Sequence, residues 1–128
     1  MHRILIVEDE AELGAVIQRH LEGEGHEVTL VGGGIEALEG ARREAFELIV
    51  LDLMLPGLDG LEVCSRLRSV GRFTNTAIVI LTAEVGNRTR DGARLFGADL
   101  FVEKPLLARP FLKQVRDLLE VFSHRTGA

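Results

Sequence analysis

The sequence contains no tryptophan, no tyrosine and a single cysteine among its 128 residues. Without those two aromatic residues, and with a formal net charge of −5, the chain lacks the basic, aromatic surface that is typical of nucleic-acid-binding domains. We therefore expect no direct binding to nucleic acid. The lone cysteine, Cys64, excludes an internal disulfide and a multi-cysteine zinc site. A free cysteine is most often a small core residue, and we expect Cys64 to be buried.

Long hydrophobic runs are also missing. The longest apolar runs have four or five residues, whereas a membrane-spanning helix needs about 20. The first residues lead directly into such a run without a signal-peptide pattern. We therefore expect a cytoplasmic protein that does not enter a membrane. With 46% hydrophobic and 27% charged residues, the composition is that of a globular domain with one core.

Five short apolar runs recur along the chain, and stretches with helical spacing connect them. The runs cover residues 4–7, 28–31, 48–51, 77–81 and 100–102. Because they are apolar throughout rather than at alternate positions, they indicate strands that are buried on both faces of a parallel sheet. This alternation favours a flavodoxin-like, doubly wound α/β fold, with a five-stranded parallel sheet in the order 2-1-3-4-5 and five helices.

Helical spacing predicts which side chains of each helix face the core. In the second helix, the predicted buried face consists of Ile35, Leu38, Ala41 and Ala45. The helix expected over residues 88–96 is weaker and more mobile, because Gly92 interrupts it and its apolar side is thin.

Domain organisation follows from the same pattern. In the last helix, the predicted buried face consists of Phe111, Val115, Leu118 and Phe122. We expect one domain over residues 1–122, followed by a weakly structured tail, 123–128, that ends the protein or begins a linker.

Acidic residues follow two strands that the predicted order makes neighbours. Glu8 and Asp9 follow the first strand, and Asp52 ends the third. Each acid by itself could be a solvated loop residue, or Glu8 or Asp9 could cap the first helix. Three acids at adjacent strand ends repel one another unless a cation joins them. Mg²⁺ suits such a site, since it binds one or two carboxylates together with water and phosphate oxygens.

A hydroxyl and an ammonium group are expected at the same edge of the sheet. Thr82 ends the fourth strand, and the fifth strand runs out into Lys104. Taken singly, Thr82 could be an ordinary strand residue and Lys104 a surface lysine. Together with the acids they suit a phosphoryl group, with Lys104 as a point charge and Thr82 as a hydrogen-bond donor.

Four segments of the chain resemble the motifs of one known family, the receiver (CheY-like) domain of two-component response regulators. The segments are ILIVEDE at residues 4–10, LDLMLPGLDG at residues 51–60, LTA at residues 81–83, and GAD at residues 97–99 through Lys104-Pro105. They stand in the order typical of that family and span almost the whole chain. The resemblance implies a domain that takes a phosphoryl group from a histidine kinase.

The resemblance also implies specific roles for the acidic residues. It makes Asp52 the phosphoacceptor and implies a bound Mg²⁺. The ion would be held by Asp9, Asp52, the backbone carbonyl of Met54 and, through water, Glu8. The family implies a signalling domain rather than a conventional enzyme, with a weak autophosphatase activity.

The resemblance further implies a conformational switch that would follow phosphorylation. By resemblance, Thr82 and Phe101 form a switch pair, and the Lys104-Pro105 peptide bond is expected to be cis. Phe101 stands where tyrosine is frequent in the family, so a switch here cannot depend on a phenolic hydroxyl.

The family implies two kinds of partner. One is a sensor histidine kinase or phosphotransfer protein. The other is a homodimer partner or effector domain on the face formed by the helix over 88–96, the strand over 100–102 and the last helix. Leu100 and Leu106 stand where the DNA-binding branch of the family often has an acid and a phenylalanine, which weakens the case for its familiar dimer.

Two alternative functions remain open. Residues 32–37, GGGIEA, fit a dinucleotide-binding fingerprint, and Asp52 follows at a suitable distance. However, that fingerprint belongs in the first strand-helix turn of a six-stranded fold. The second alternative is an atypical receiver that binds partners without being phosphorylated. Such domains usually lack one of the key residues, and this chain keeps all of them.

Overall fold

The computed structural model describes residues 1–55, 58–73, 75–83 and 97–125. Five parallel strands form one sheet in the order β2-β1-β3-β4-β5, which confirms the expected flavodoxin-like topology. The strands are β1 (Arg3–Val7), β2 (Glu27–Val31), β3 (Leu48–Asp52), β4 (Ala77–Thr82) and β5 (Leu100–Glu103).

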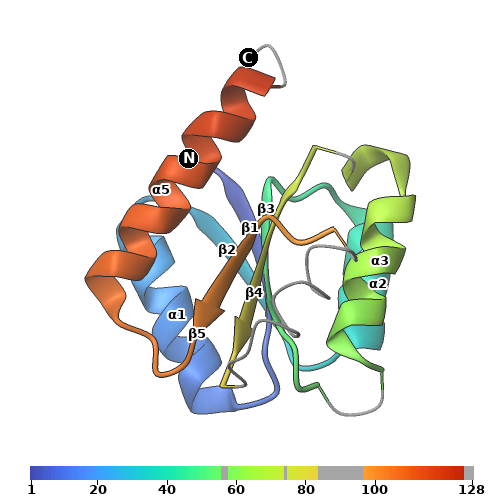
Figure 1. Ribbon diagram of the computed structural model, residues 1–128, viewed down its shortest axis with the longest axis horizontal. Coiled ribbons are helices and arrows are strands. Elements are labelled where there is room, and N and C mark those ends of the chain that lie inside the picture. Colours follow the sequence, from blue (N-terminus) through green and yellow to red (C-terminus); the bar gives the residue numbers. More distant parts are fainter. Residues whose placement is uncertain (56–57, 74, 84–96, 126–128) are drawn as a thin grey trace.

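The described helices cover both faces of this sheet. They are α1 (Ala11–Gly23), α2 (Gly34–Arg43), α3 (Gly60–Ser69), a 3-10 turn η1 (Gly71–Phe73) and α5 (Ala108–Arg125). Helices α1 and α5 lie on one face, and α2 and α3 on the other (Figure 1). The helix expected over residues 88–96, with Gly92, lies outside the described residues. Within the described ranges, no helix has the length and hydropathy of a membrane span.

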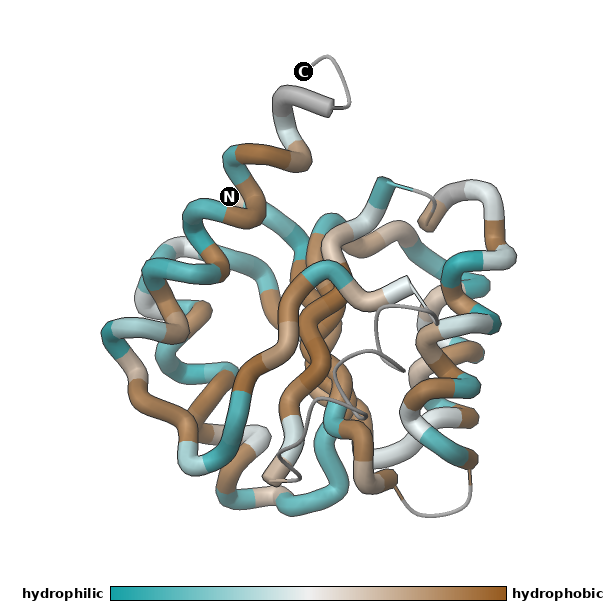
Figure 2. The backbone as a smooth tube through the Cα atoms, in the orientation of Figure 1, coloured by the Kyte–Doolittle hydropathy of each residue, from teal (hydrophilic) through white to brown (hydrophobic). Residues whose placement is uncertain are grey.

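The core consists of two layers, one on each face of the sheet. Successive strand residues point to opposite faces, so Leu5 and Val7 pack toward α2 and α3 whereas Ile4 and Ile6 pack toward α1 and α5. Apart from Arg3, Asp52 and Thr82 at their ends, the three central strands are accordingly apolar (Figure 2). Cys64 is fully buried, as the sequence predicted.

Strand register aligns the carboxyl ends of the strands at one edge of the sheet. Val7 lies opposite Leu51, Asp52 lies opposite Leu81, and Thr82 lies opposite Glu103. The chain reverses its direction of winding between β1 and β3, which is where open α/β sheets bind ligands. Residues that follow these strands therefore meet at one place.

The predicted buried face of α2 was partly wrong. Ala41 is buried, but Ile35 is 62% exposed and Ala45 is also exposed. Gly34 and Ala37 face inward instead. A Cβ atom on Gly34 would lie 2.6 Å from Val63 Cγ2 of α3. The closeness of α3 therefore selects the smallest side chains of α2 for the interior.

The last helix is longer than expected. The sequence predicted a weakly structured tail from Ser123, but α5 continues to Arg125. No proline or glycine stands between 123 and 125 to end the helix. Leu119 is buried besides the predicted Phe111, Val115 and Phe122. Residues 126–128 lie outside the described residues.

Candidate functional site

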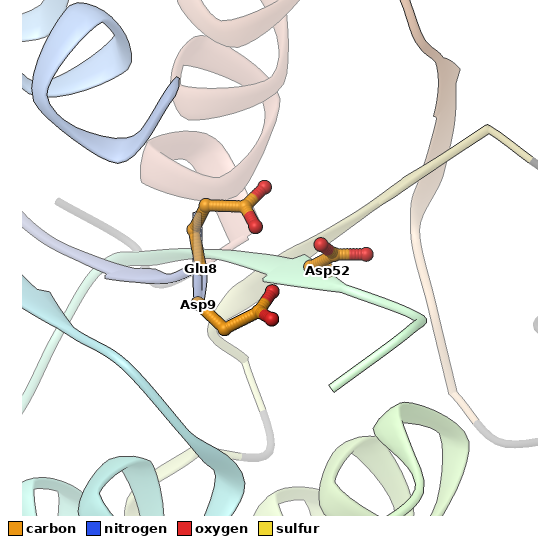
Figure 3. Close-up of side chains that lie close together, drawn as sticks. All are labelled: Glu8, Asp9 and Asp52. Atoms are coloured by element: carbon orange, nitrogen blue, oxygen red, sulfur yellow. The ribbon is translucent and has the colours of Figure 1, made fainter. Parts of the chain in front are cut away.

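Three carboxylates meet at the ends of β1 and β3. Glu8 and Asp52 are each only 3% exposed, whereas Asp9 is exposed. One oxygen from each of the three side chains lies within 4.8 Å of the others. Figure 3 shows the three side chains extending into the same space. The fold thus brings together acids that are more than 40 positions apart in the chain.

Lys104 supplies positive charge to this cluster. Its Nζ atom lies 3.0 Å from Asp52 Oδ2 and 3.1 Å from Glu8 Oε1. The Lys104 backbone N–H donates to the carbonyl oxygen of Thr82 at 2.8 Å, which ties the exit of β5 to the end of β4. The Lys104-Pro105 peptide bond is cis, as the family resemblance implied.

The two buried acids differ in protonation. Burial, reinforced by a hydrogen bond with Asp52, raises the pKa of Glu8 to about 7. Burial would also raise the pKa of Asp52, but hydrogen bonds from Glu8, the Met54 N–H and Lys104 outweigh it and lower that pKa. Below a pH of about 7 the pair therefore holds its proton on Glu8 and its negative charge on Asp52.

Lys104 remains charged in this setting. Burial alone would lower its pKa, but the hydrogen bond with Asp52 and the close carboxyl group of Glu8 outweigh burial and raise it. An ionised carboxylate and an ammonium group thus lie side by side in a largely buried pocket.

Both oxygens of the Asp52 carboxylate are held. Oδ1 accepts a hydrogen bond from the Met54 backbone N–H at 2.9 Å, and Oδ2 accepts one from Lys104. The family resemblance implied a role for the Met54 carbonyl but none for the Met54 N–H. Only the turn after β3 brings this N–H to Asp52, so no residue pattern could have indicated it. The Met54 side chain is 65% exposed.

Helix capping does not explain Glu8 and Asp9. The N-cap position of α1 is occupied by Glu10, whose side chain makes no capping hydrogen bond. Glu8 Oε2 instead accepts a hydrogen bond from the Glu10 N–H at 3.2 Å. The capping alternative is therefore wrong.

Thr82 and Phe101, the expected switch pair, lie on neighbouring strands. Thr82 is fully buried at the end of β4. Phe101 lies opposite Ile80 in β5. Its side chain is half-buried and packs against the core layer that α2 and α3 cover.

Gly34, the last residue of the glycine run at residues 32–34, has a packing role. A Cβ atom on Gly34 would also lie 3.2 Å from Leu58 Cβ. The start of α2 thus faces α3 at close range. This close contact explains why residue 34 is a glycine, so a dinucleotide-binding role is not needed to explain it.

The donor atoms of the acid cluster fit a hard divalent cation. All three side chains offer carboxylate oxygens, which Mg²⁺ prefers. Glu8 Oε1 is buried and has no hydrogen bond within the described structure, although the Lys104 ammonium is near. A cation or its water could satisfy this oxygen.

Comparison with known proteins identifies relatives of this chain. Residues 4–116 match the family model of the response regulator receiver domain. The response regulator MprA of Mycobacterium leprae is 39% identical over 117 residues, which are 91% of this chain and 50% of the relative. The chain thus spans about half the length of the curated relatives that it matches.

Solved structures show the same architecture. A CheY-like receiver domain protein from Methanospirillum hungatei superposes with a TM-score of 0.92 at 25% identity, over 98% of each chain. The receiver domain of the sensor histidine kinase PA1611 from Pseudomonas aeruginosa has a TM-score of 0.85 at 28% identity, over 93% of this chain and 98% of that one. That structure has a magnesium ion coordinated in its active site cleft. The chain belongs to the receiver-domain family of two-component response regulators.

Proposed function

We propose that this receiver domain accepts a phosphoryl group on Asp52 from a histidine kinase or phosphotransfer protein, in a Mg²⁺-dependent reaction, and thereby switches partner binding. One observation carries the proposal. Asp52 is buried, stays ionised beside Lys104 at 3.0 Å, and has each carboxylate oxygen oriented by a donor.

The chemistry follows from this geometry. An Asp52 oxygen attacks the phosphorus of a phosphohistidine, the phosphorus–nitrogen bond breaks, and its electron pair returns to the imidazole. The product is an acyl phosphate on Asp52. Lys104 lies close enough to exchange its contact with Asp52 for one with a phosphoryl oxygen. The buried Thr82 hydroxyl, at the same edge, would donate to another.

Asp9, Asp52, the Met54 carbonyl and, through water, Glu8 would hold the Mg²⁺ ion. When bound, the ion offsets the charge repulsion between the carboxylates and the incoming phosphoryl group. Slow attack by water on the acyl phosphate would return Asp52 to its free form, which is the weak autophosphatase activity that we propose.

The family and this geometry support phosphorylation over the atypical receiver. A domain that only binds partners needs neither an ionised buried aspartate nor a lysine beside it. A histidine kinase obtains its phosphoryl group from cellular nucleotide, so we place the domain in the cytoplasm. The output partner, whether an effector domain or a second receiver, would read the face that includes β5 and α5.

Intact mass spectrometry after incubation with acetyl phosphate tests the proposal. With Mg²⁺, the wild type should gain the mass of one phosphoryl group, and with EDTA it should not. Asp52→Asn keeps the shape of the side chain but removes the nucleophile, so it should gain nothing. Asp117→Asn makes the same chemical change at an exposed position of α5 and should behave as the wild type.

Two results would contradict the assignment. One is unchanged Mg²⁺-dependent labelling of Asp52→Asn. The other is a wild type that binds Mg²⁺ but takes no phosphoryl group from any donor, which would favour the atypical receiver.

A further inference from the structure

Gly60, the first residue of α3, lies against the backbone that leaves β3. A Cβ atom at this position would be 2.7 Å from the Asp52 carbonyl oxygen, 2.7 Å from the Leu53 carbonyl oxygen and 2.8 Å from Leu53 Cα. All three neighbours are backbone atoms, which cannot rotate away as the end of a side chain can. The start of α3 therefore touches the phosphoacceptor's own main chain, and only glycine permits this approach.

The other glycines that the structure describes do not make such a contact. Among the described residues, those whose Cβ atom would come closer than 3.0 Å to a neighbour are Gly14, Gly33, Gly34, Gly60 and Gly97. Gly60 alone among these meets backbone atoms at that range, because the others meet side chains. An added methyl group at Gly60 must therefore displace the turn after β3 or the start of α3.

Hydrogen bonds fix both sides of the contact. On the strand side, the Leu53 N–H donates to the Leu81 carbonyl oxygen at 3.0 Å. On the helix side, Asp59 Oδ1 caps α3 by accepting from the Leu61 N–H at 2.8 Å. The peptide after Asp52 is thus held between β4 and the first turn of α3.

We propose that Gly60 is a positioning residue for the phosphoacceptor: its missing side chain sets the path of the Asp52–Met54 turn. The Met54 N–H that orients the Asp52 carboxylate belongs to this turn. So does the Met54 carbonyl, to which the proposed function assigns a metal contact. The inference rests on the proposed function for its consequence in phosphorylation, but the positioning itself is observable in the unphosphorylated protein.

The test compares Gly60→Ala with Gly40→Ala. Both add one methyl group to a helix, but a Cβ atom on Gly40 has no neighbour within 4 Å. Three quantities are measured: the chemical shift and hydrogen exchange of the Met54 amide without metal, the Mg²⁺ dissociation constant, and the rate of phosphorylation by acetyl phosphate.

In Gly60→Ala we expect a shifted Met54 amide with faster exchange, because its bond to Asp52 lengthens. Mg²⁺ affinity should fall by about tenfold to a hundredfold, the usual effect of losing a group that orients a metal ligand. The phosphorylation rate should fall by a similar factor. Gly40→Ala should match the wild type in all three.

A destabilised but folded Gly60→Ala with a wild-type Met54 amide and wild-type Mg²⁺ affinity would overturn the proposal, because Gly60 would then serve packing alone. If the variant unfolds in dilute buffer, it and the wild type are compared in trimethylamine N-oxide, which favours the compact state. If Gly60→Ala also fails to fold in trimethylamine N-oxide, Gly60 is needed for folding as a whole, and the proposed positioning role is overturned. A wild type that takes no phosphoryl group, beside a Gly60→Ala with a displaced Met54 amide, would refute the proposed function and leave the positioning role intact.

Discussion

At the scale of single residues, the two buried acids of the site differ in pKa because of their surroundings rather than their residue type. Glu8 and Asp52 are both buried carboxylates, yet burial dominates at Glu8 whereas hydrogen-bond donors dominate at Asp52. The group with the lowered pKa is the proposed nucleophile. The group with the raised pKa is the acid that, in the proposed site, would contact Mg²⁺ through water.

The raised pKa of Glu8 predicts a pH dependence for the metal-free domain. In the folded state the pKa is about 7 against an ordinary 4.5, so folding favours the protonated form. This stabilisation is complete below the ordinary value and is lost as pH rises through about 7, for a total of about 3 kcal/mol at most. The pKa of Asp52 is lowered, so its contribution to stability is lost only as pH falls below the ordinary pKa of an aspartate.

Urea unfolding in EDTA between pH 5 and 8 measures this effect. For the wild type, the Glu8 contribution makes the free energy of unfolding fall as pH rises over this range. Glu8→Gln should lack this contribution, so its free energy of unfolding should fall less with pH. Burial lowers the pKa of His26, which makes the free energy of unfolding rise with pH. This effect is the same in the wild type and in Glu8→Gln, so it cancels when the two proteins are compared. Glu120→Gln, at an exposed position of α5, serves as the control. Equal slopes for wild type and Glu8→Gln would show that Glu8 is ionised throughout.

At the scale of elements, small residues decide how the helices approach one another. Gly34, Ala37 and Ala41 form the inward face of α2, opposite Val63 of α3. Helix α3 also holds the entry of β5, because Arg68 donates to the Gly97 carbonyl oxygen at 2.9 Å and pairs with Asp99. The strand that carries Phe101 and leads into Lys104 is thus anchored from the last turn of α3.

Two alanine substitutions in α2 should have opposite effects. Gly40→Ala should stabilise the domain by about 0.5–1 kcal/mol, because it improves helix propensity in open space. Gly34→Ala should destabilise it by about 1–3 kcal/mol through overpacking against Val63.

Urea unfolding checks both values. Adding Val63→Ala to Gly34→Ala should cost less than the sum of the two single changes, because it removes the clashing methyl group. Additive losses would mean that the two positions are not in contact.

At the scale of the whole molecule, the site lies at the carboxyl edge of the sheet, between the two core layers that cover its faces. Thr82 reaches this edge from β4, and Phe101 links β5 to the layer under α2 and α3. The proposed phosphorylation of Asp52 would add negative charge and acceptor oxygens at this edge. We expect Thr82 to move toward them and Phe101 to turn further inward.

The energy available to this switch is modest. Complete burial of an aromatic ring is worth about 1.5–3 kcal/mol, but Phe101 is already half-buried. Further burial therefore contributes about 1 kcal/mol, which biases an equilibrium between two conformations without locking it.

NMR with beryllofluoride and Mg²⁺, a stand-in for the phosphoryl group, tests the route. In the wild type, shift changes should extend from the acid pocket through residues 88–102. Thr82→Ala and Phe101→Ala should still accept a phosphoryl group by mass, with changes confined to the pocket. Thr29→Ala, on the distant edge strand β2, is the control. Wild-type changes that stay in the pocket would refute this route.

The sequence by itself determined the strands, their order and the meeting of Glu8, Asp9, Asp52, Thr82 and Lys104. Continuous apolar runs and short connections reduce the topology to a few parallel arrangements, of which the flavodoxin-like order is the default for five strands. Residues that follow parallel strands then share an edge of the sheet. The roles of these residues came from family resemblance and remain proposals.

Only the tertiary structure decided the rotation of α2, the protonation of the acids and the contact of Gly60. Ile35 points outward because α3 occupies the space beside Gly34. The pKa of Glu8 is raised chiefly because the fold buries its carboxyl group, whereas hydrogen-bond donors outweigh burial at Asp52. Each outcome depends on which groups approach within a few ångströms, and a local pattern of residue types contains no information about such distances.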